Sequence, residues 1–334
     1  MKVLVTGGLG FIGSHTVVEL LNNSYEVIVI DNLSNSKLDV INKIKKITNK
    51  IFKFYQGDVC DKENLEIVFR DNNVDAVIHF AGFKAVGESV EKPLMYYQNN
   101  IFSTINLCDL MNKYNVHNIV FSSSATVYGD PEELPIKESF EVKHATNPYG
   151  ETKIINENIL KDLYKSNNSW NIAILRYFNP IGAHKSGLIY ENPNDIPNNL
   201  MPYIVKVATK ELKELSVFGN DYDTIDGTGV RDYIHVVDLA KAHIKALEWT
   251  LKNNGCDVFN IGTGKGYSVL ELVNAFKKYN NVDVPYKIVG RRSGDIAACY
   301  ADVSHAKDVL GWSSMYDIED MVKDAYLFTK INSK

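Results

Sequence analysis

The first thirteen residues constrain the fold more than any other stretch of the chain. An apolar run ends at Thr6, glycines follow at positions 7, 10 and 13, and residues 14–21 then have apolar side chains at helical spacing. This order predicts a buried strand, a tight turn and a helix. Gly7 allows the sharp turn, Gly10 lets backbone N–H groups approach a pyrophosphate, and Gly13 lets the helix pack against the strand. The helix N-terminus adds a positive dipole, so we expect a dinucleotide at this turn.

A carboxylate completes this signal. Residues 25–31 are predicted to form a second buried strand that ends at Asp31, 24 positions after Gly7. An acid at this place accepts hydrogen bonds from the adenosine ribose and repels the extra phosphate of NADP. The predicted cofactor is therefore NAD.

Length and composition narrow the class of protein. A chain of 334 residues that is 45% hydrophobic can bury a large core and is long enough for two domains. We expect an NAD-binding domain over 1–180, rejoined by about 235–262, and a smaller α/β substrate domain over 181–334. The formal charge of −5 argues against nucleic-acid binding.

The same features predict a cytoplasmic protein. The four cysteines are scattered without a close pair, which indicates a reducing compartment and neither a zinc site nor a disulfide framework. Glycines break the first apolar run far short of an export signal, and no run approaches the roughly 18 apolar residues of a membrane helix. We expect no metal and no membrane contact.

Strand and helix patterns alternate through the first half of the chain. We expect strands at 51–59, 74–82 and 118–124, with helices at 65–70 and 96–113 between them. This alternation predicts an α/β fold of the Rossmann type, a doubly wound parallel sheet with ligands at the carboxyl ends of its strands. Asp58 lies just past one such end, where it either meets the adenine amino group or is an ordinary turn aspartate.

A tyrosine and a lysine specify chemistry. Residues 148–153 open a predicted helix, and the i, i+4 spacing puts Tyr149 and Lys153 on one face. The strand at 118–124 brings Ser122 and Ser124 to the same rim. Ionising a phenol at pH 7 requires lowering its pKa by about three pH units, or about 4 kcal/mol. One nearby ammonium lowers it by about one to three pH units, so we expect an oxidised nicotinamide to supply a second positive charge.

These motifs resemble those of the extended short-chain dehydrogenase/reductase superfamily. The resemblance rests on the glycines at 7, 10 and 13, the serine-rich strand, and Tyr149 with Lys153. Residues 1 to about 315 resemble more closely the UDP-glucose 4-epimerase family, through segments at 198–202, 215–219, 229–235 and 291–295. The resemblance implies a homodimer paired through helices at about 96–113 and 149–164, and a UDP-sugar as substrate.

The resemblance also implies roles for individual residues. Tyr149, Lys153 and Ser124 are the expected catalytic residues. The expected NAD-binding residues are Gly7, Gly10, Phe11, Ile12, Gly13, Asp31, Asn32, Asn35, Ser36, Asp58, Val59, Phe80, Ala81, Gly82, Lys84, Asn99, Ser122, Tyr149, Lys153, Tyr177 and Phe178. The expected substrate-binding residues are Lys84, Ser124, Tyr149, Asn179, Asn198, Asn199, Leu200, Ser216, Val217, Phe218, Arg231, Tyr233, Arg292, Asp295 and Cys299. A surface lysine is the alternative for Lys84.

The implied reaction interconverts UDP-galactose and UDP-glucose. Ionised Tyr149 would take the proton of the sugar 4-hydroxyl while C4 is transiently oxidised, and Ser124 would steady that proton. A nucleotide-sugar 4,6-dehydratase is a weaker alternative, because the Asp-Glu pair of those enzymes is replaced by Ala125 and Thr126. Another sugar epimerase and a non-catalytic dinucleotide-binding protein are the remaining alternatives.

One position bears on the range of substrates. In the family, a bulky tyrosine at the position of Cys299 accompanies restriction to glucose and galactose. The smaller cysteine would open room for an N-acetyl group, so UDP-N-acetylglucosamine and UDP-N-acetylgalactosamine are also expected substrates. The neighbouring Tyr300 would restore the bulky gate if the register were shifted by one residue.

Overall fold

A parallel sheet forms the centre of the computed structural model, which describes residues 1–142, 144–192, 197, 199–292 and 294–332. Over those ranges its strand order is β10-β6-β5-β4-β1-β2-β3, and every neighbouring pair is parallel. The strands are β1 (Lys2–Thr6), β2 (Glu26–Asp31), β3 (Lys53–Gln56), β4 (Ala76–His79), β5 (Asn118–Ser124), β6 (Asn171–Tyr177) and β10 (Gly255–Ile261). The predicted Rossmann-type sheet is confirmed.

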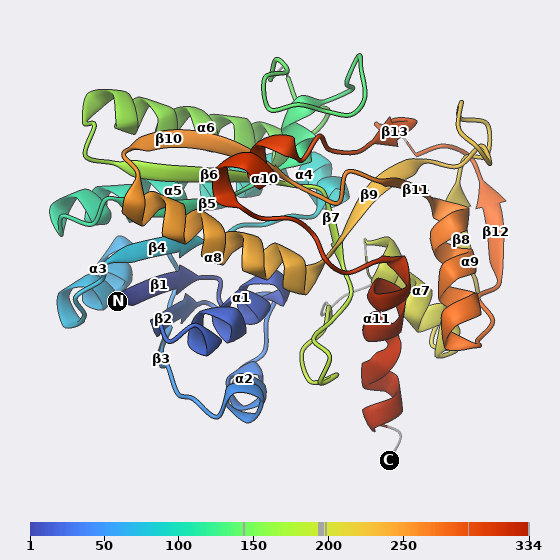
Figure 1. Ribbon diagram of the computed structural model, residues 1–334, viewed down its shortest axis with the longest axis horizontal. Coiled ribbons are helices and arrows are strands. Elements are labelled where there is room, and N and C mark those ends of the chain that lie inside the picture. Colours follow the sequence, from blue (N-terminus) through green and yellow to red (C-terminus); the bar gives the residue numbers. More distant parts are fainter. Residues whose placement is uncertain (143, 193–196, 198, 293, 333–334) are drawn as a thin grey trace.

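Helices cover both faces of this sheet (Figure 1). One face packs against α1 (Phe11–Asn22), α2 (Val40–Thr48) and α8 (Val236–Lys252), and the other against α3 (Lys62–Asp71), α5 (Pro93–Lys113) and α6 (Pro148–Ser166). Because the strands are covered on both sides, their residues form near-continuous apolar runs. The sheet therefore separates two hydrophobic cores, one on each of its faces.

The second half gathers at one end of this sheet (Figure 1). A second sheet has the order β11-β9-β13, with β7 also paired to β9, and β8 pairs with β12. Its strands are β7 (Asn179–Ile181), β8 (Leu215–Phe218), β9 (Val230–His235), β11 (Gly266–Ser268), β12 (Tyr286–Val289) and β13 (Ala298–Cys299). The helices of this region are α7 (Leu200–Ala208), α9 (Val269–Asn280) and α11 (Ile318–Asn332), whereas α10 (Ser304–Leu310) packs against α8 and β10 of the central sheet. Buried apolar residues of α7, α9 and α11 form a separate core there.

Several element boundaries differ from the sequence expectation, and local capping explains the differences at the helices. The helix expected at 65–70 begins at Lys62, because the Asp61 side chain accepts hydrogen bonds from the Glu63 and Asn64 backbone N–H groups. Helix α6, by contrast, begins at Pro148 as expected, because the Asn147 side chain accepts a hydrogen bond from Gly150 N. The strand expected at 51–59 is confined to Lys53–Gln56, where it pairs with β2.

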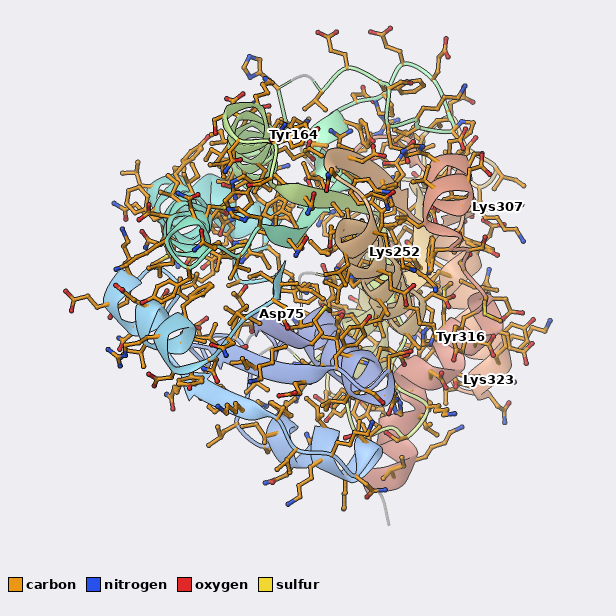
Figure 2. The ribbon with its side chains drawn as sticks, turned by 60° about the vertical axis from the view of Figure 1, so that its left-hand side comes forward. Asp75, Tyr164, Lys252, Lys307, Tyr316 and Lys323 are labelled. Atoms are coloured by element: carbon orange, nitrogen blue, oxygen red, sulfur yellow. The ribbon has the colours of Figure 1, made fainter. Side chains whose placement is uncertain are left out.

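A buried aspartate at the start of α8 connects the Rossmann sheet's helix layer to the C-terminal segment. The Asp238 carboxylate has no exposed surface, and its Oδ2 accepts hydrogen bonds from Met315 N at 2.7 Å and Tyr316 N at 2.9 Å. The Tyr316 ring also stacks on His235 with 4.2 Å between centroids. Figure 2 labels Tyr316 and, further along the same segment, Lys323. Asp238 therefore holds the segment that precedes α11 against the start of α8.

No helix in the described part of the chain is both long enough and apolar enough to cross a membrane.

Replacing Asp238 by Ala should destabilise the fold. The D238A change removes a carboxylate that accepts hydrogen bonds from two partly buried N–H groups, Met315 N and Tyr316 N, each bond to a charged group contributing about 1.5 kcal/mol. We expect the free energy of unfolding, measured by urea denaturation, to fall by about 3 kcal/mol. The matched control D308A lies at an exposed position of α10 and should change it by less than about 0.5 kcal/mol. Equal stability of the two variants would contradict the assigned role of Asp238.

Candidate active site

The glycine turn after β1 has no room for side chains. Gly7 has a φ of +66°, which favours glycine. A Cβ at Gly13 would lie 2.3 Å from the Gly7 carbonyl oxygen, so α1 can start this close to the turn only with glycine there. Gly10 is the N-cap of α1 and provides no side-chain cap. The first N–H groups of the helix are therefore left for an anion, which fits a pyrophosphate.

The acidic groups at the ends of β2 and β3 fit the adenosine half of a dinucleotide. Asp31 accepts hydrogen bonds from Leu9 N at 3.0 Å, Leu33 N at 2.9 Å and Ser36 Oγ at 2.7 Å. These contacts fix the carboxylate at the strand end beside the glycine turn, and an ionised carboxylate has further acceptor capacity. Asn32 Nδ2 donates to Asp58 Oδ2 at 3.0 Å, so the two predicted acids lie on neighbouring strand ends.

The segment after β4 lies against the same turn. A Cβ at Gly7 would be 3.0 Å from Ala81 N, and Phe80 N donates to the Thr6 carbonyl at 3.1 Å. Gly82 packs against the Asn100 side chain, which also accepts a hydrogen bond from Asn99 Nδ2 at 3.0 Å. These small groups form a wall beside the glycine turn.

Other residues predicted to bind NAD are dispersed around this wall. Phe11 and Ile12 open α1, Val59 is buried, and Asn35 lies exposed in the loop after β2. Lys84 forms an ion pair with Glu191, with 2.9 Å between Nζ and Oε1. Tyr177 contacts His243 through its hydroxyl, and Phe178 N donates to the Ile261 carbonyl at 3.1 Å.

The catalytic candidates converge where α6 meets the end of β5. Lys153 Nζ donates to the Ser122 carbonyl at 2.6 Å and lies 5.8 Å from the centre of the Tyr149 ring. Ser124 ends β5, and its hydroxyl accepts a hydrogen bond from Thr126 Oγ1 at 3.0 Å. The same hydroxyl acts on the Tyr149 phenol in the direction that lowers its pKa. The arrangement places a phenol, a hydroxyl and an ammonium at the carboxyl edge of the sheet.

Burial dominates the electrostatics of this group. Burial raises the pKa of Tyr149 above its ordinary value, and the Ser124 hydrogen bond only partly offsets this effect. Burial also lowers the pKa of Lys153 to about 8, while the Glu157 carboxylate acts in the opposite direction. The protein alone thus does not lower the phenol pKa. Ionisation of Tyr149 needs an additional positive charge, such as the one expected from an oxidised nicotinamide.

The arginines predicted to bind substrate share one aspartate. Arg292 pairs with Asp295 through Nε at 3.2 Å and Nη2 at 3.0 Å, and Arg231 Nη2 lies 3.9 Å from the same carboxylate. The Arg292 guanidinium also lies 5.4 Å from the centre of the Phe218 ring, which is 43% exposed. Tyr233 is only 3% exposed and packs in the core of the second half. Of the two aromatic candidates, Phe218 therefore has the accessible ring.

The other substrate candidates lie on the elements around these arginines. Asn199 is the N-cap of α7 and its Nδ2 donates to Glu191 Oε1 at 2.6 Å, while Leu200 begins the helix. Ser216 and Val217 lie in β8, where the Val217 side chain is buried. Asn179 begins β7 and is exposed. Asn198 lies outside the described residues.

Cys299 lies in a small buried cluster near the end of β5. It is 9% exposed and shares a cluster with Val127 and Phe178, residues that follow β5 and β6. The Tyr300 ring instead lies over β11, where a Cβ at Gly266 would be 3.1 Å from it. Cys299 rather than Tyr300 therefore faces the segment that follows Ser124.

Sequence reasoning missed three charged residues at the site. Glu157 of α6 and Arg176 of β6 form a buried ion pair next to β5, with 2.6 Å between Oε2 and Nη2. Glu191 links Lys84 to Asn199. Glu157 could have been noticed because it lies four residues after Lys153 on the same helix, and Arg176 because it interrupts an apolar strand pattern. Nothing in the sequence near Glu191 indicates its two partners.

The chain is similar to proteins of known activity over its whole length. Residues 3–262 match the NAD dependent epimerase/dehydratase family. A UDP-glucose 4-epimerase of Bacillus subtilis is 58% identical over 99% of this chain and 98% of its own length.

Two solved structures share the fold. A UDP-glucose 4-epimerase from Bifidobacterium longum, in complex with NAD⁺ and UDP, is 54% identical with a TM-score of 0.97, covering 100% of this chain and 99% of its own. A UDP-Glc/GlcNAc 4-epimerase from Campylobacter jejuni is 36% identical with a TM-score of 0.86, covering 99% of each chain.

Fold, glycine turn and comparisons agree on the class of this protein. The turn has the backbone donors and the close packing that a dinucleotide pyrophosphate requires. NAD is its cofactor, and it is an enzyme of the isomerase class. The chain therefore belongs to the NAD dependent epimerase/dehydratase family, and its similarity within that family is to the UDP-glucose 4-epimerases.

Proposed function

We propose that this enzyme interconverts UDP-galactose and UDP-glucose by transient oxidation at C4 of the sugar. The observation that carries the proposal is the position of Tyr149, beside Ser124 and one helical turn before Lys153, at the sheet edge where the glycine turn also lies. The names of the similar proteins support the same substrate pair.

In the proposed mechanism the chain's residues move one proton and hold the substrate. Bound NAD supplies reversible oxidation and, in its oxidised form, a positive charge. Tyr149 accepts the proton of the sugar 4-hydroxyl and returns it, and Ser124 keeps the phenol oxygen and the substrate oxygen in line. Lys153 stabilises the phenolate from the next turn of α6. The proton therefore ends where it began.

Inversion at C4 requires a firm hold on the nucleotide and a loose hold on the sugar. Arg231 and Arg292 are suited to the diphosphate, because guanidinium groups pair with two phosphate oxygens at once. Phe218 offers a ring face for the base or ribose. Lys84, Asn179 and Asn199 are proposed to contact phosphate or sugar oxygens at the rim. A sugar bound by few direct contacts can present either face to the reacting centre.

The alternatives are weaker on specific observations. A 4,6-dehydratase needs an acid and a base directly after the strand serine, but Ala125 has neither and Thr126 contacts Ser124. A protein that only binds a dinucleotide would not require Ser124, Tyr149 and Lys153 to lie together at one site.

Purified enzyme incubated with UDP-galactose, without added cofactor, should produce UDP-glucose. The Y149F variant removes the proton acceptor, so we expect kcat to fall by at least about a hundredfold while UDP still binds. The assay is separation of the two sugar nucleotides by chromatography, and UDP binding is measured by calorimetry.

The matched control for this test is Y164F, the same change on the same helix at a position labelled in Figure 2. Y164F should retain wild-type turnover. Absence of turnover in the wild type would refute the proposed function, and wild-type turnover by Y149F would remove Tyr149 from the mechanism.

We further propose that the N-acetylated UDP-hexoses are substrates. The support is the small Cys299 side chain beside Phe178 and Val127, where a tyrosine would be far larger. The similarity to a UDP-Glc/GlcNAc 4-epimerase is consistent with this range.

Replacing Cys299 by Tyr should reduce kcat/KM for UDP-N-acetylglucosamine by about tenfold or more and leave UDP-galactose turnover nearly unchanged. The reason is steric, because the ring would fill space needed by the N-acetyl group. The variant C299A keeps that space and should retain both activities. The proposal is wrong if the wild type does not epimerise the N-acetyl sugar, or if C299Y epimerises it as fast as the wild type.

A homodimer is proposed through α5 and α6. On α5, Leu94, Phe102 and Ile105 are 74%, 54% and 44% exposed, and their spacing puts them on one face of the helix. An apolar helix face of this kind is typical of an interface between subunits.

We also propose that the enzyme is located in the cytoplasm. Its four cysteines are free, which fits a reducing compartment.

The variant F102E should shift the enzyme toward monomer in analytical ultracentrifugation, because a charge would be buried in the interface. The control I51E alters an apolar residue that is 79% exposed outside α5 and α6 and should leave the association state unchanged. If F102E sediments like the wild type, the interface does not include this face.

A further inference from the structure

A buried carboxylate lies directly behind the catalytic lysine. Glu157 is 1% exposed and follows Lys153 by four residues on α6, so the two side chains project from the same face of the helix. Its oxygens accept hydrogen bonds from Ser123 Oγ at 2.6 Å and Lys161 Nζ at 3.1 Å. Arg176 donates to both oxygens, through Nε at 2.9 Å and Nη2 at 2.6 Å. One carboxylate thus connects α6 to β5 and β6.

These contacts fix the strand that carries the catalytic serine. Ser123 lies between Ser122, whose carbonyl accepts the Lys153 hydrogen bond, and Ser124. In the sheet register Ser123 is paired with Arg176, so Glu157 binds both members of one cross-strand pair. The position of β5 relative to α6, and with it the distance from Ser124 to Tyr149, depends on this carboxylate.

The surroundings of Lys153 make a nearby anion necessary. Its ammonium lies 5.0 Å from the Phe121 ring centre and donates to a neutral carbonyl. Burial lowers the pKa of His79, from β4, to about 3, and burial raises the pKa of Tyr177, from β6, so both are uncharged at neutral pH. Tyr149 is also a neutral phenol in the protein alone. Glu157 is the acidic group whose charge acts to keep Lys153 protonated against its burial.

Stability alone does not account for this pair. A buried ion pair is often no more stabilising than apolar residues of similar volume, because both charges lose their hydration. Arg176 also keeps a buried Nη1 without a hydrogen-bond partner. A buried ion pair that folding does not require, placed against the candidate catalytic residues, points to a role in the reaction.

We infer that Glu157 is a positioning residue for the proton transfer. It holds Lys153 as a charged ammonium beside Tyr149, and it fixes the position of β5, which carries Ser124, relative to α6. The role is exerted through Lys153 and Ser123, since Glu157 itself is buried behind them. The inference rests on the proposed function for its kinetic consequences, but the charge state of Lys153 can be measured without turnover.

The test is E157Q, which removes the negative charge and keeps the shape of the side chain. Loss of the anion favours neutral Lys153, so its pKa should fall and the alkaline limb of the kcat–pH profile should move to lower pH by about one unit. Because E157Q leaves Arg176 buried without its partner, the double variant E157Q/R176Q is measured as well. The double variant removes both charges, so we expect it to fold. The alkaline limb of its kcat–pH profile should still lie at lower pH than in the wild type.

A readout independent of activity is the titration of the Lys153 side chain by NMR on enzyme labelled with carbon-13 at the lysine ε position. The Lys153 signal is identified by its absence in K153M, and its midpoint should fall by about one pH unit in both Glu157 variants. The control E66Q removes a carboxylate that pairs with Lys113 on the surface and should leave the Lys153 midpoint and the pH profile unchanged.

A folded double variant with the wild-type Lys153 midpoint and alkaline limb would overturn the inference and leave Glu157 a structural residue. Absence of epimerisation by the wild type would refute the proposed function instead, and the NMR midpoints would still decide the role of Glu157.

Discussion

The hydrogen bond from the Lys153 ammonium to the Ser122 carbonyl is the contact on which the geometry of the candidate active site depends. It joins the first turns of α6 to the carboxyl end of β5, so that Tyr149 and Ser124 meet although 24 residues separate them in the sequence. The ammonium can lie at this depth only because the surrounding groups compensate for lost hydration. The carbonyl of Ser122 and the carboxylate of Glu157 provide that compensation from two sides.

The same burial explains why the protein alone does not ionise its phenol. A closed, apolar setting penalises every charge, and it raises the Tyr149 pKa while it lowers that of Lys153. The charge of the oxidised cofactor changes this balance when it is bound. In the proposed mechanism, proton acceptance by Tyr149 is thereby coupled to the presence of oxidised NAD, so that the sugar would be deprotonated only when its oxidation can follow. The physical cost of burial thereby becomes a source of selectivity.

Much of the first half could be predicted, because its information is local. The strand at 118–124 was predicted with the bounds that β5 has, and the glycine spacing predicted the turn before α1. The site residues remain predictions, although the structure brings Tyr149, Lys153 and Ser124 together. What was missed depends on contacts between distant segments. The expectation that Lys153 lowers the Tyr149 pKa, with an oxidised nicotinamide as a second positive charge, left out the burial that raises this pKa. Glu157 and Arg176 belong to no recognisable motif.

The sequence by itself determined the order of elements in the first half of the chain and the nature of the cofactor, and it named the candidates for the reacting side chains. Alternating apolar periods, glycines in a fixed spacing and an acid at a strand end are all properties of short segments. The tertiary structure alone decided which charges are buried and which partners they have. It directed Cys299 rather than Tyr300 toward the catalytic strand, and it brought Arg231 and Arg292 to a shared aspartate. The placement of Cys299 and Arg231 follows from the pairing of β13 with β9, and no local pattern encodes that pairing.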